Sequence, residues 1–161
     1  MSRAFVKEDA VEEDVVARPI SSHPNYVTAA GLEQTERAFE AARQAHIAAQ
    51  TIGDRAELAK AASELRYWSA RRSSARVLTP NPNRDAVQFG STVTVMRDGR
   101  KQTFQIVGED EAAPQNGKLS YVSPLARAIM NKKVGDTADL GGSEIELLAV
   151  SSDAIAAGKQ G

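Results

Sequence analysis

The sequence predicts an α+β protein in which an antiparallel α-helical hairpin is followed by a small antiparallel β domain with one short helix. Two helical patterns support the hairpin, because apolar or small residues recur every three or four positions over residues 28–50 and again over 56–77. Two prolines in residues 79–85 then stop helix formation and mark a linker. Over residues 86–152, apolar and polar residues alternate with a period of two, which indicates strands.

The first helix is predicted to begin at Thr28, whose hydroxyl can accept a hydrogen bond from a free amide of the first turn. The stretch that follows is rich in Ala, Glu, Gln and Arg, which favour helices. Its apolar seam proceeds in steps of three and four and consists of Leu32, Thr35, Phe39, Ala42, His46 and Ala49. This spacing is typical of a helix that packs along one side against a partner helix.

A second helix is predicted after a short turn at Gly53. Its seam has the same spacing and consists of Leu58, Ala61, Leu65, Trp68, Arg72 and Ala75. Each helix should hold roughly 22 residues and measure about 33 Å, because the rise is about 1.5 Å per residue. Two seams of equal length with a tight connection predict an antiparallel hairpin, a coiled coil, over residues 26–78.

The β domain is predicted from alternation and from turn residues. Residues 92–95 alternate threonine with valine, and the Asp-Gly pair at 98–99 is a strong signal for a two-residue hairpin turn. Further strands are predicted at 118–123 and 143–152, and Pro124 favours the first turn of a short helix between them. We expect these strands to form an antiparallel sheet with the helix on one face.

Composition limits the class of protein. The 161 residues have room for one globular domain with a helical attachment. Cysteine is absent, which excludes disulfides and thiolate metal sites and fits a reducing compartment. No run approaches ~18 apolar residues, and the first residues lack the apolar core of a signal peptide. We therefore expect a cytoplasmic protein without a membrane span.

Charge is distributed unevenly, although the net charge is only −1. Residues 1–27 carry five acidic and three basic side chains, whereas residues 54–78 carry six basic and three acidic ones. Residues 1–25 are predicted to form a flexible acidic tail, and residues 153–161 a second tail. The alternative is an acidic arm that lies against a basic partner or against the protein's own basic segment. We interpret the arginines of that segment as a solvated helix face rather than a nucleic-acid patch.

The carboxylates of Asp54 and Glu57 are predicted to lie at the hairpin tip, close to the first turn of the second helix. A capping box, with Asp54 as N-cap and Glu57 as the third helical residue, is a sufficient explanation of the pair. The alternative is that two exposed acids lend oxygen ligands to a Mg²⁺ held elsewhere, since this hard cation binds carboxylates. His23 and His46 have no spacing that indicates zinc, so we expect no metal bound by the protein alone.

Several ordered stretches of the chain resemble one known family, the bacterial Gre transcript-cleavage factors GreA and GreB. The resemblance covers roughly residues 25–150 and is densest in the β domain. The matching strings are "NYVTAAGL" (25–32), "GDRAE" (53–57), "FGSTVTV" (89–95), "FQIVGEDEA" (104–112), "GKLSYVSPLARAIMNKKVGD" (117–136) and "IELLAV" (145–150).

The resemblance implies an FKBP-like fold for residues 86–152 and a specific partner. In Gre-like proteins this domain docks at the mouth of the secondary channel of bacterial RNA polymerase, and the hairpin enters the channel. Acids matching Asp54 and Glu57 then help to bind the second Mg²⁺ of the polymerase, which itself hydrolyses backtracked RNA. The factor would thus be no enzyme, would hold no cofactor, and would meet nucleic acid only through the transcription complex. The residues implied in polymerase binding are Ser123, Pro124, Leu125 and Arg127.

This sequence departs from the family pattern in two respects. Leu58 replaces an asparagine that commonly follows the tip acids, and Arg55 adds a positive charge beside them. The first helix is also shorter than in GreA by about two turns, a loss of roughly 11 Å of reach. Oxygen ligands of Mg²⁺ lie at about 2.0–2.1 Å, so side-chain motion cannot make up this loss. The departures favour binding to polymerase over stimulation of RNA cleavage. The leading hypothesis is a polymerase-binding elongation factor that can stimulate cleavage of backtracked RNA, and a non-cleaving regulator of the Rnk type is the alternative. We also expect a monomer.

Two further classes remain as alternatives. An FKBP-like prolyl isomerase would need an apolar, aromatic-lined pocket, but the β domain offers only Phe89, Phe104 and Tyr121 as aromatics. A protein-interaction module could use the hairpin as a coiled-coil docking rod.

Overall fold

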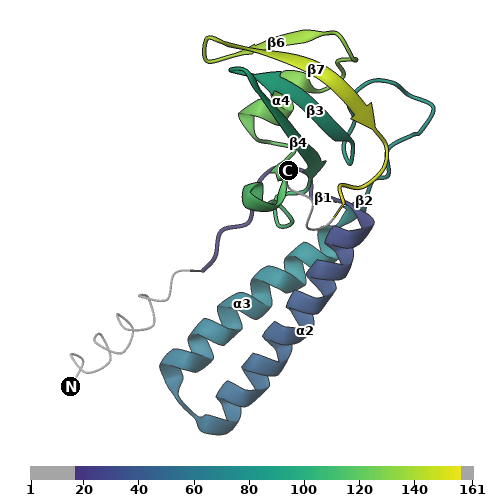
Figure 1. Cartoon of the computed structure of the whole chain (residues 1–161). Helices are drawn as coiled ribbons and strands as arrows, with labels where there is room; N and C mark the ends of the chain where they lie inside the picture. The colour runs from purple at the N-terminus through teal and green to yellow at the C-terminus, as the bar shows by residue number, and fades with distance from the viewer. Residues whose placement is uncertain (1–16, 157–161) are drawn as a thin grey trace. The chain divides into compact units, whose positions relative to one another are not determined.

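The computed structural model describes residues 17–156. Within this range the chain divides into two compact units (Figure 1). The hairpin unit comprises residues 17–24 and Glu33–Ala75, and the β unit comprises Asn25–Leu32 together with the chain from Arg76 onward. The first turn of the first long helix therefore belongs to the β unit.

Two helices make up most of the hairpin unit. Helix α2 spans Ala29–Ile52 and helix α3 spans Arg55–Ser74, and the two lie side by side (Figure 1). Gly53 ends α2 with a positive φ of 78°, a conformation that glycine adopts without steric cost, and its amide donates to the carbonyl of Ala49 at 3.0 Å. The predicted hairpin and its turn are confirmed.

The predicted seam of α2 is also confirmed. Thr35, Ala42 and Ala49 are buried, and the residues between them on the seam are half-buried. The seven-residue spacing of these three positions returns to the same side of the helix after two turns. Because alanine has no side chain beyond Cβ, the two helix backbones can approach closely along this line.

The predicted seam of α3 brings Arg72 against α2, because its guanidinium lies 4.6 Å from the ring centroid of Phe39. The Arg72 side chain is exposed, whereas Arg71, one position earlier, retains only 2% of its accessible surface. Ser63 and Tyr67 are the other buried residues of α3, and they lie on the same side as Arg71 because four residues make about one turn. The side of α3 that bears Ser63, Tyr67 and Arg71 is therefore shielded from solvent, in addition to the side that faces α2.

The cover is supplied in part by the segment that precedes the hairpin. The backbone amide of Arg18 donates to Oγ of Ser63 at 3.4 Å, and its guanidinium forms an ion pair with Glu64 at 3.2 Å. The same guanidinium lies 3.9 Å from the ring centroid of Tyr67 and 5.3 Å from that of Trp68. Such cation–π contacts contribute roughly 0.5–1 kcal/mol at partly exposed sites.

Part of the predicted flexible tail, residues 17–24, is thus placed against α3 through Arg18. Residues 1–16 and 157–161 lie outside the described residues, and for them the prediction of flexible tails stays a prediction.

The β unit contains a five-stranded sheet of order β5-β4-β3-β7-β6. Its strands are β3 (Thr92–Arg97), β4 (Arg100–Val107), β5 (Lys118–Ser120), β6 (Thr137–Leu140) and β7 (Ser143–Ser151). A separate pair of two-residue strands, β1 (Tyr26–Val27) and β2 (Arg76–Val77), is parallel. Helix α4 spans Pro124–Ile129, in agreement with the predicted short helix.

The sheet is mixed, so the prediction of an antiparallel sheet is wrong at one edge. Strands β4 and β5 are parallel, with Gln105 opposite Lys118, whereas the other neighbours are antiparallel. The ten residues 108–117, which include the 3₁₀ turn Pro114–Asn116, return the chain so that β5 runs in the direction of β4. Strand β6 was also missed; it has only four residues, of which Thr137 and Asp139 are exposed and Ala138 and Leu140 are half-buried.

Two tight turns set the register of the sheet. Asp98 and Gly99 between β3 and β4 have φ values of 53° and 75°, and Gly141 and Gly142 between β6 and β7 have 60° and 86°. Two consecutive positive φ values define the turn type whose twist matches that of antiparallel strands. The hairpin turn predicted at 98–99 is confirmed.

The core of the β unit lies between the sheet and α4. Its buried residues are Val87, Val93, Val95, Phe104, Ile106, Ala126, Ile129, Ile145 and Leu147. Val93 and Val95 face this core, while Thr94 on the other side bonds Thr103 through their hydroxyls at 2.9 Å. Burying each large aliphatic side chain contributes about 1.5–3 kcal/mol. Among residues 17–156, no helix has the length and apolar character needed to cross a membrane.

Helix α2 begins at a buried polar junction inside the β unit. The hydroxyl of Thr28 accepts from the amide of Gly31 at 2.9 Å and donates to Oε1 of Glu111 at 2.6 Å. The Glu111 side chain is only 4% exposed, and Nζ of Lys118 lies 3.6 Å from its other oxygen. A Cβ at position 31 would come within 2.5 Å of Oε1, so glycine leaves the space that this carboxylate occupies. The predicted N-cap is confirmed, and Glu111 is its second partner.

We predict that Thr28→Val lowers the free energy of unfolding by about 2–4 kcal/mol, because it removes the helix cap and leaves a buried carboxylate without its hydroxyl donor. Urea denaturation followed by circular dichroism measures the change. Thr28→Ser keeps the hydroxyl and is the matched control, expected to lose less than about 1 kcal/mol. Equal losses in the two variants would contradict the role of the hydroxyl.

Candidate functional site

The first predicted site, at the turn between α2 and α3, contains the two acids of the hairpin tip. Asp54 is the N-cap of α3, and its Oδ1 accepts hydrogen bonds from the amides of Ala56 at 3.0 Å and Glu57 at 3.3 Å. Glu57 lies in the first turn of the helix, where a negative charge complements the helix dipole. The predicted N-cap at Asp54 is therefore present.

The cap leaves carboxylate oxygens available. Both acids are exposed, and among residues 17–156 neither Oδ2 of Asp54 nor the carboxylate of Glu57 has a hydrogen-bond or ion-pair partner. The described part of the chain contains no group of three or more His, Asp or Glu residues that could hold a metal ion. Two carboxylates alone supply too few ligands for Mg²⁺, so they could only complete a site whose other ligands come from elsewhere.

The second predicted site surrounds α4 in the β unit. Oγ of Ser123 caps this helix by accepting from the amide of Ala126 at 3.3 Å, and Pro124 occupies its first position. Leu125 packs against the core, whereas Pro124 and Arg127, three residues apart, are exposed. Of the four residues predicted to bind polymerase, two are thus turned outward and two hold the helix in place.

A rigid turn after α4 adds an exposed apolar residue that the sequence analysis missed. The amide of Lys133 donates to Oδ2 of Asp136 at 2.8 Å, and the amide of Asp136 donates back to the carbonyl of Lys133 at 2.9 Å. Gly135 has a φ of 91°, and Val134 beside it is 57% exposed. Gly135 in "KKVGD" signals a turn, but the sequence carries no signal that Val134 is exposed.

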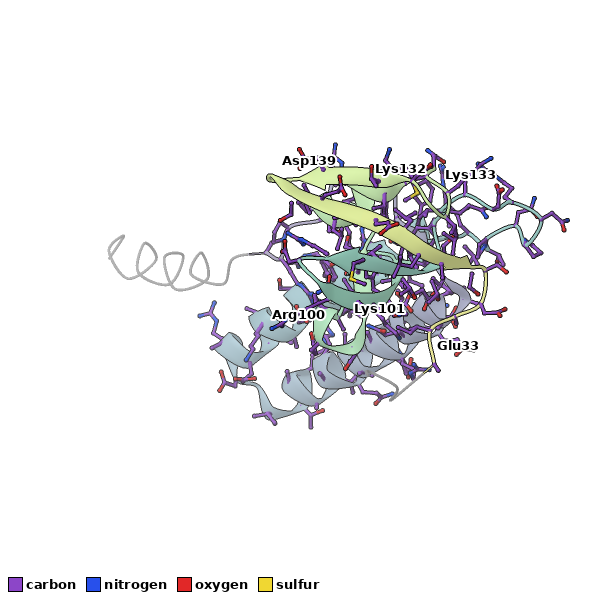
Figure 2. All side chains as sticks on the ribbon, turned by 45° about the horizontal axis from the view of Figure 1, so that its top comes forward. Glu33, Arg100, Lys101, Lys132, Lys133 and Asp139 are labelled. Carbon is purple, nitrogen blue, oxygen red and sulfur yellow. The ribbon has the colours of Figure 1, made fainter. Side chains whose placement is uncertain are left out.

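The backbone on either side of this turn is paired with the rest of the β unit. The amide of Asn131 donates to Val87 at 3.0 Å, the amide of Val87 donates to Lys132 at 2.8 Å, and that of Gly135 donates to Leu147 at 2.9 Å. Lys132 and Lys133 are labelled next to each other at the margin of the β unit in Figure 2. We call Pro124, Arg127, Lys133 and Val134 the α4 surface.

The aromatic side chains of the β unit pack on one another or in the core. Phe104 is buried, and Phe89 makes edge-to-face contacts with Tyr26 at 6.0 Å and with Tyr121 at 5.6 Å between ring centroids. Tyr26 and Tyr121 complete the cluster at 5.5 Å. These rings stabilise the fold by contacts worth about 0.5–1.5 kcal/mol each.

Comparison with known proteins identifies the family. The family model described as "Transcription elongation factor, GreA/GreB, C-term" matches residues 81–150. GreA of Pseudomonas putida is 32% identical over 138 residues, which cover 73% of this chain and 86% of that protein. The chain belongs to the GreA/GreB family. The resemblance recognised in the sequence is confirmed.

Other GreA/GreB relatives match over shorter stretches. GreA of Maricaulis maris is 47% identical over 73 residues, 42% of this chain, so the chain spans about half the length of that relative, 46%. Among solved structures, the GreA factor homolog 1 of Thermus thermophilus is 23% identical, with a TM-score of 0.38 over 80% of this chain and 99% of that chain.

We predict that Asp54→Ala lowers hairpin stability by about 1 kcal/mol, because it removes the acceptor for two amides of the first turn. Asp54→Asn keeps a capping oxygen and should change stability by less than about 0.5 kcal/mol. Thermal unfolding followed by helical circular dichroism compares the two. The same loss in both variants would mean that the charge, rather than the cap, stabilises α3.

Proposed function

We propose that this protein regulates transcription elongation by binding bacterial RNA polymerase at its secondary channel. In this proposal the α4 surface of the β unit docks at the channel mouth and the hairpin occupies the channel. Membership in the GreA/GreB family supports the partner. The observation that carries the proposal is the pair of exposed carboxylates, Asp54 and Glu57, at the turn of the hairpin.

The tip acids would act by completing a metal site of the polymerase. A Mg²⁺ ion binds oxygen ligands, and Oδ2 of Asp54 and the carboxylate of Glu57 are two such ligands that the fold leaves unused among residues 17–156. Asp54 and Glu57 would help to hold the ion, and the chemistry it would supply is activation of water for hydrolysis of the backtracked RNA. The polymerase performs the hydrolysis, so this protein would have no enzymatic activity and no cofactor of its own.

A second candidate is a regulator of the Rnk type, which binds polymerase without stimulating cleavage. The capping bonds of Asp54 favour it, because they give this residue a structural role that needs no metal. The loss of roughly 11 Å of reach expected from a helix two turns shorter than in GreA also favours it. Binding to polymerase is common to both candidates.

Docking would use the residues of the α4 surface that face solvent. Pro124 and Val134 supply exposed apolar area, and Arg127 supplies positive charge. Lys133 is also exposed, and its ammonium forms an ion pair with Asp85 at 3.6 Å. Ser123 and Leu125 would act indirectly, because the first caps α4 and the second packs against the core. A surface held by backbone hydrogen bonds loses little conformational entropy on binding.

We predict that Asp54→Asn and Glu57→Gln each reduce factor-stimulated RNA cleavage by at least about tenfold if the acids bind the metal, because a neutral amide is a poor Mg²⁺ ligand. Polymerase halted in a backtracked state, with labelled RNA, measures the cleavage rate. Each amide is nearly the size of its acid, and Asn retains the cap, so a loss of activity would not reflect an unfolded tip.

Two other outcomes separate the candidates. Binding without cleavage by the unaltered protein supports the Rnk-type regulator. Cleavage that neither substitution changes contradicts the metal-ligand role. Absence of binding to polymerase contradicts the proposed function as a whole.

We predict that Arg127→Glu and Val134→Glu weaken binding to polymerase by about tenfold or more, since each places a negative charge in a docking surface of positive and apolar character. Equilibrium binding to fluorescently labelled polymerase measures the dissociation constant. Lys101→Glu makes the same change of charge as Arg127→Glu at an exposed position of β4 and is the matched control (Figure 2). Equal weakening by Lys101→Glu would indicate nonspecific electrostatic attraction instead.

A further inference from the structure

Strand β4 has a free edge in the β unit. Strand β3 pairs with residues 100–105 of β4 on one side, whereas β5 pairs only with residues 105–107 on the other. Within the described chain, residues 17–156, no strand therefore lies beside residues 100–103 on the side of β5. All four of these residues are exposed. We call this side of residues 100–103 the β4 edge.

The main-chain groups of Lys101 and Thr103 point outward at the β4 edge. The amide of Gln105 donates to the carbonyl of Gly117 at 2.7 Å, so the main-chain groups of Gln105 point away from β3. The N–H and C=O groups of alternate residues point to the same edge of a strand, so those of Thr103 and Lys101 share this direction. The β4 edge thus presents two amides and two carbonyls with which an extended polypeptide can pair as an added strand.

Two arginines lie directly opposite each other beside this edge. Arg97 is the register partner of Arg100, so the two side chains share one face of the sheet. Like charges in this arrangement repel each other and destabilise the hairpin. Among residues 17–156, the exposed side chain of Arg100 has no ion-pair partner. The hairpin of β3 and β4 therefore carries a positive charge that a ligand with negative charge would offset.

The guanidinium of Arg97 has a buried donor without an acceptor. Arg97 also lies opposite Ile145, a core residue, so its stem runs along the margin of the core. Its Nε is buried and has no hydrogen-bond partner within residues 17–156. Oδ2 of Asp98 lies 3.9 Å from Nε, too far for a hydrogen bond. Because an unpaired buried donor lowers stability, an acceptor supplied by another molecule would be favourable here.

The chemistry of the β4 edge favours an acidic extended segment. A strand added there would place alternate side chains on the face of Arg97 and Arg100, and carboxylates accept hydrogen bonds from guanidinium groups in pairs. A second copy of this chain would bring Arg100 and Lys101 of two molecules together, and charges of this kind keep sheet edges apart. A nucleic-acid phosphate would meet the arginines but would not complete the strand pairing that Lys101 and Thr103 offer.

We propose that the β4 edge binds an extended segment of another protein, with aspartate or glutamate at alternate positions. The segment adds a strand beside β4, its main chain pairs with Lys101 and Thr103, and its carboxylates contact Arg97 and Arg100. This surface shares no residue with the α4 surface. The inference therefore goes beyond the proposed function and does not depend on docking at the secondary channel.

Hydrogen exchange in the full chain, labelled with ¹⁵N, tests the strand pairing. The probe is a synthetic peptide of about eight residues that alternates glutamate and valine, a usual length for a strand. At about 1 mM peptide, the amides of Lys101 and Thr103 are expected to exchange at least about tenfold more slowly than without it. The amides of Gln102 and Phe104, which point toward β3, are expected to change little. Unchanged exchange at Lys101 and Thr103 overturns the proposal.

Substitutions test the arginines, with the anisotropy of the fluorescently labelled peptide as the measurement. Arg100→Gln is expected to weaken peptide binding by at least about fivefold. Arg97→Lys keeps the charge but removes the guanidinium and its Nε donor, and a similar loss is expected. Lys101→Gln makes the same change of charge as Arg100→Gln, but its side chain lies on the opposite face of β4, so it is the matched control (Figure 2). Arg100 and Lys101 are both exposed, so neither replacement disturbs the core.

Three outcomes of the binding experiment overturn the proposal. Equal weakening by Arg100→Gln and Lys101→Gln would indicate general electrostatic attraction. Equal affinity for a peptide that alternates lysine and valine would show that the carboxylates are not recognised. Binding of a single-stranded oligonucleotide of the same net charge, without binding of the acidic peptide, would indicate a phosphate ligand instead.

Discussion

The carboxylate of Glu111 is buried, and a buried charge is tolerated only where partners replace the lost water. Here the partners come from distant parts of the sequence: the hydroxyl of Thr28, the ammonium of Lys118 and the positive end of α2. Gly31 has no Cβ, and this leaves room for the carboxylate, since any side chain at position 31 would displace it. The buried carboxylate of Glu111 therefore holds the start of α2 and the loop after β4 together.

Local signals predicted the parts of the fold that local forces determine. The turn at Gly53, the cap at Thr28 and the hairpin at Asp98-Gly99 each follow from the backbone preferences of one or two residues. The parallel pairing of β5 with β4 follows instead from a ten-residue loop, for which no short pattern exists. The burial of Arg71 on a second side of α3 has a similar origin, since Arg18 covers that side from more than forty residues away.

The two candidate sites also differ in how far the local sequence predicts them. The position of Asp54 and Glu57 at an exposed turn was predictable, because capping and exposure both follow from the sequence at the turn. The outward face of α4 was only partly predictable. Which of Ser123, Pro124, Leu125 and Arg127 face solvent depends on where the sheet lies beneath the helix. Val134 was missed because a single exposed valine has no sequence signature until the turn that holds it is known.

The alanine seam of the hairpin has a consequence for its motion. Each buried methyl contributes only about 0.8 kcal/mol, much less than a leucine at the same position. Amide hydrogens near Gly53 are expected to exchange with solvent earlier than those at the start of α2, because residues 50–57 are all exposed. Asp54 and Glu57 would then lie at the end of the hairpin that opens most easily, where local opening would change the positions of their carboxylates.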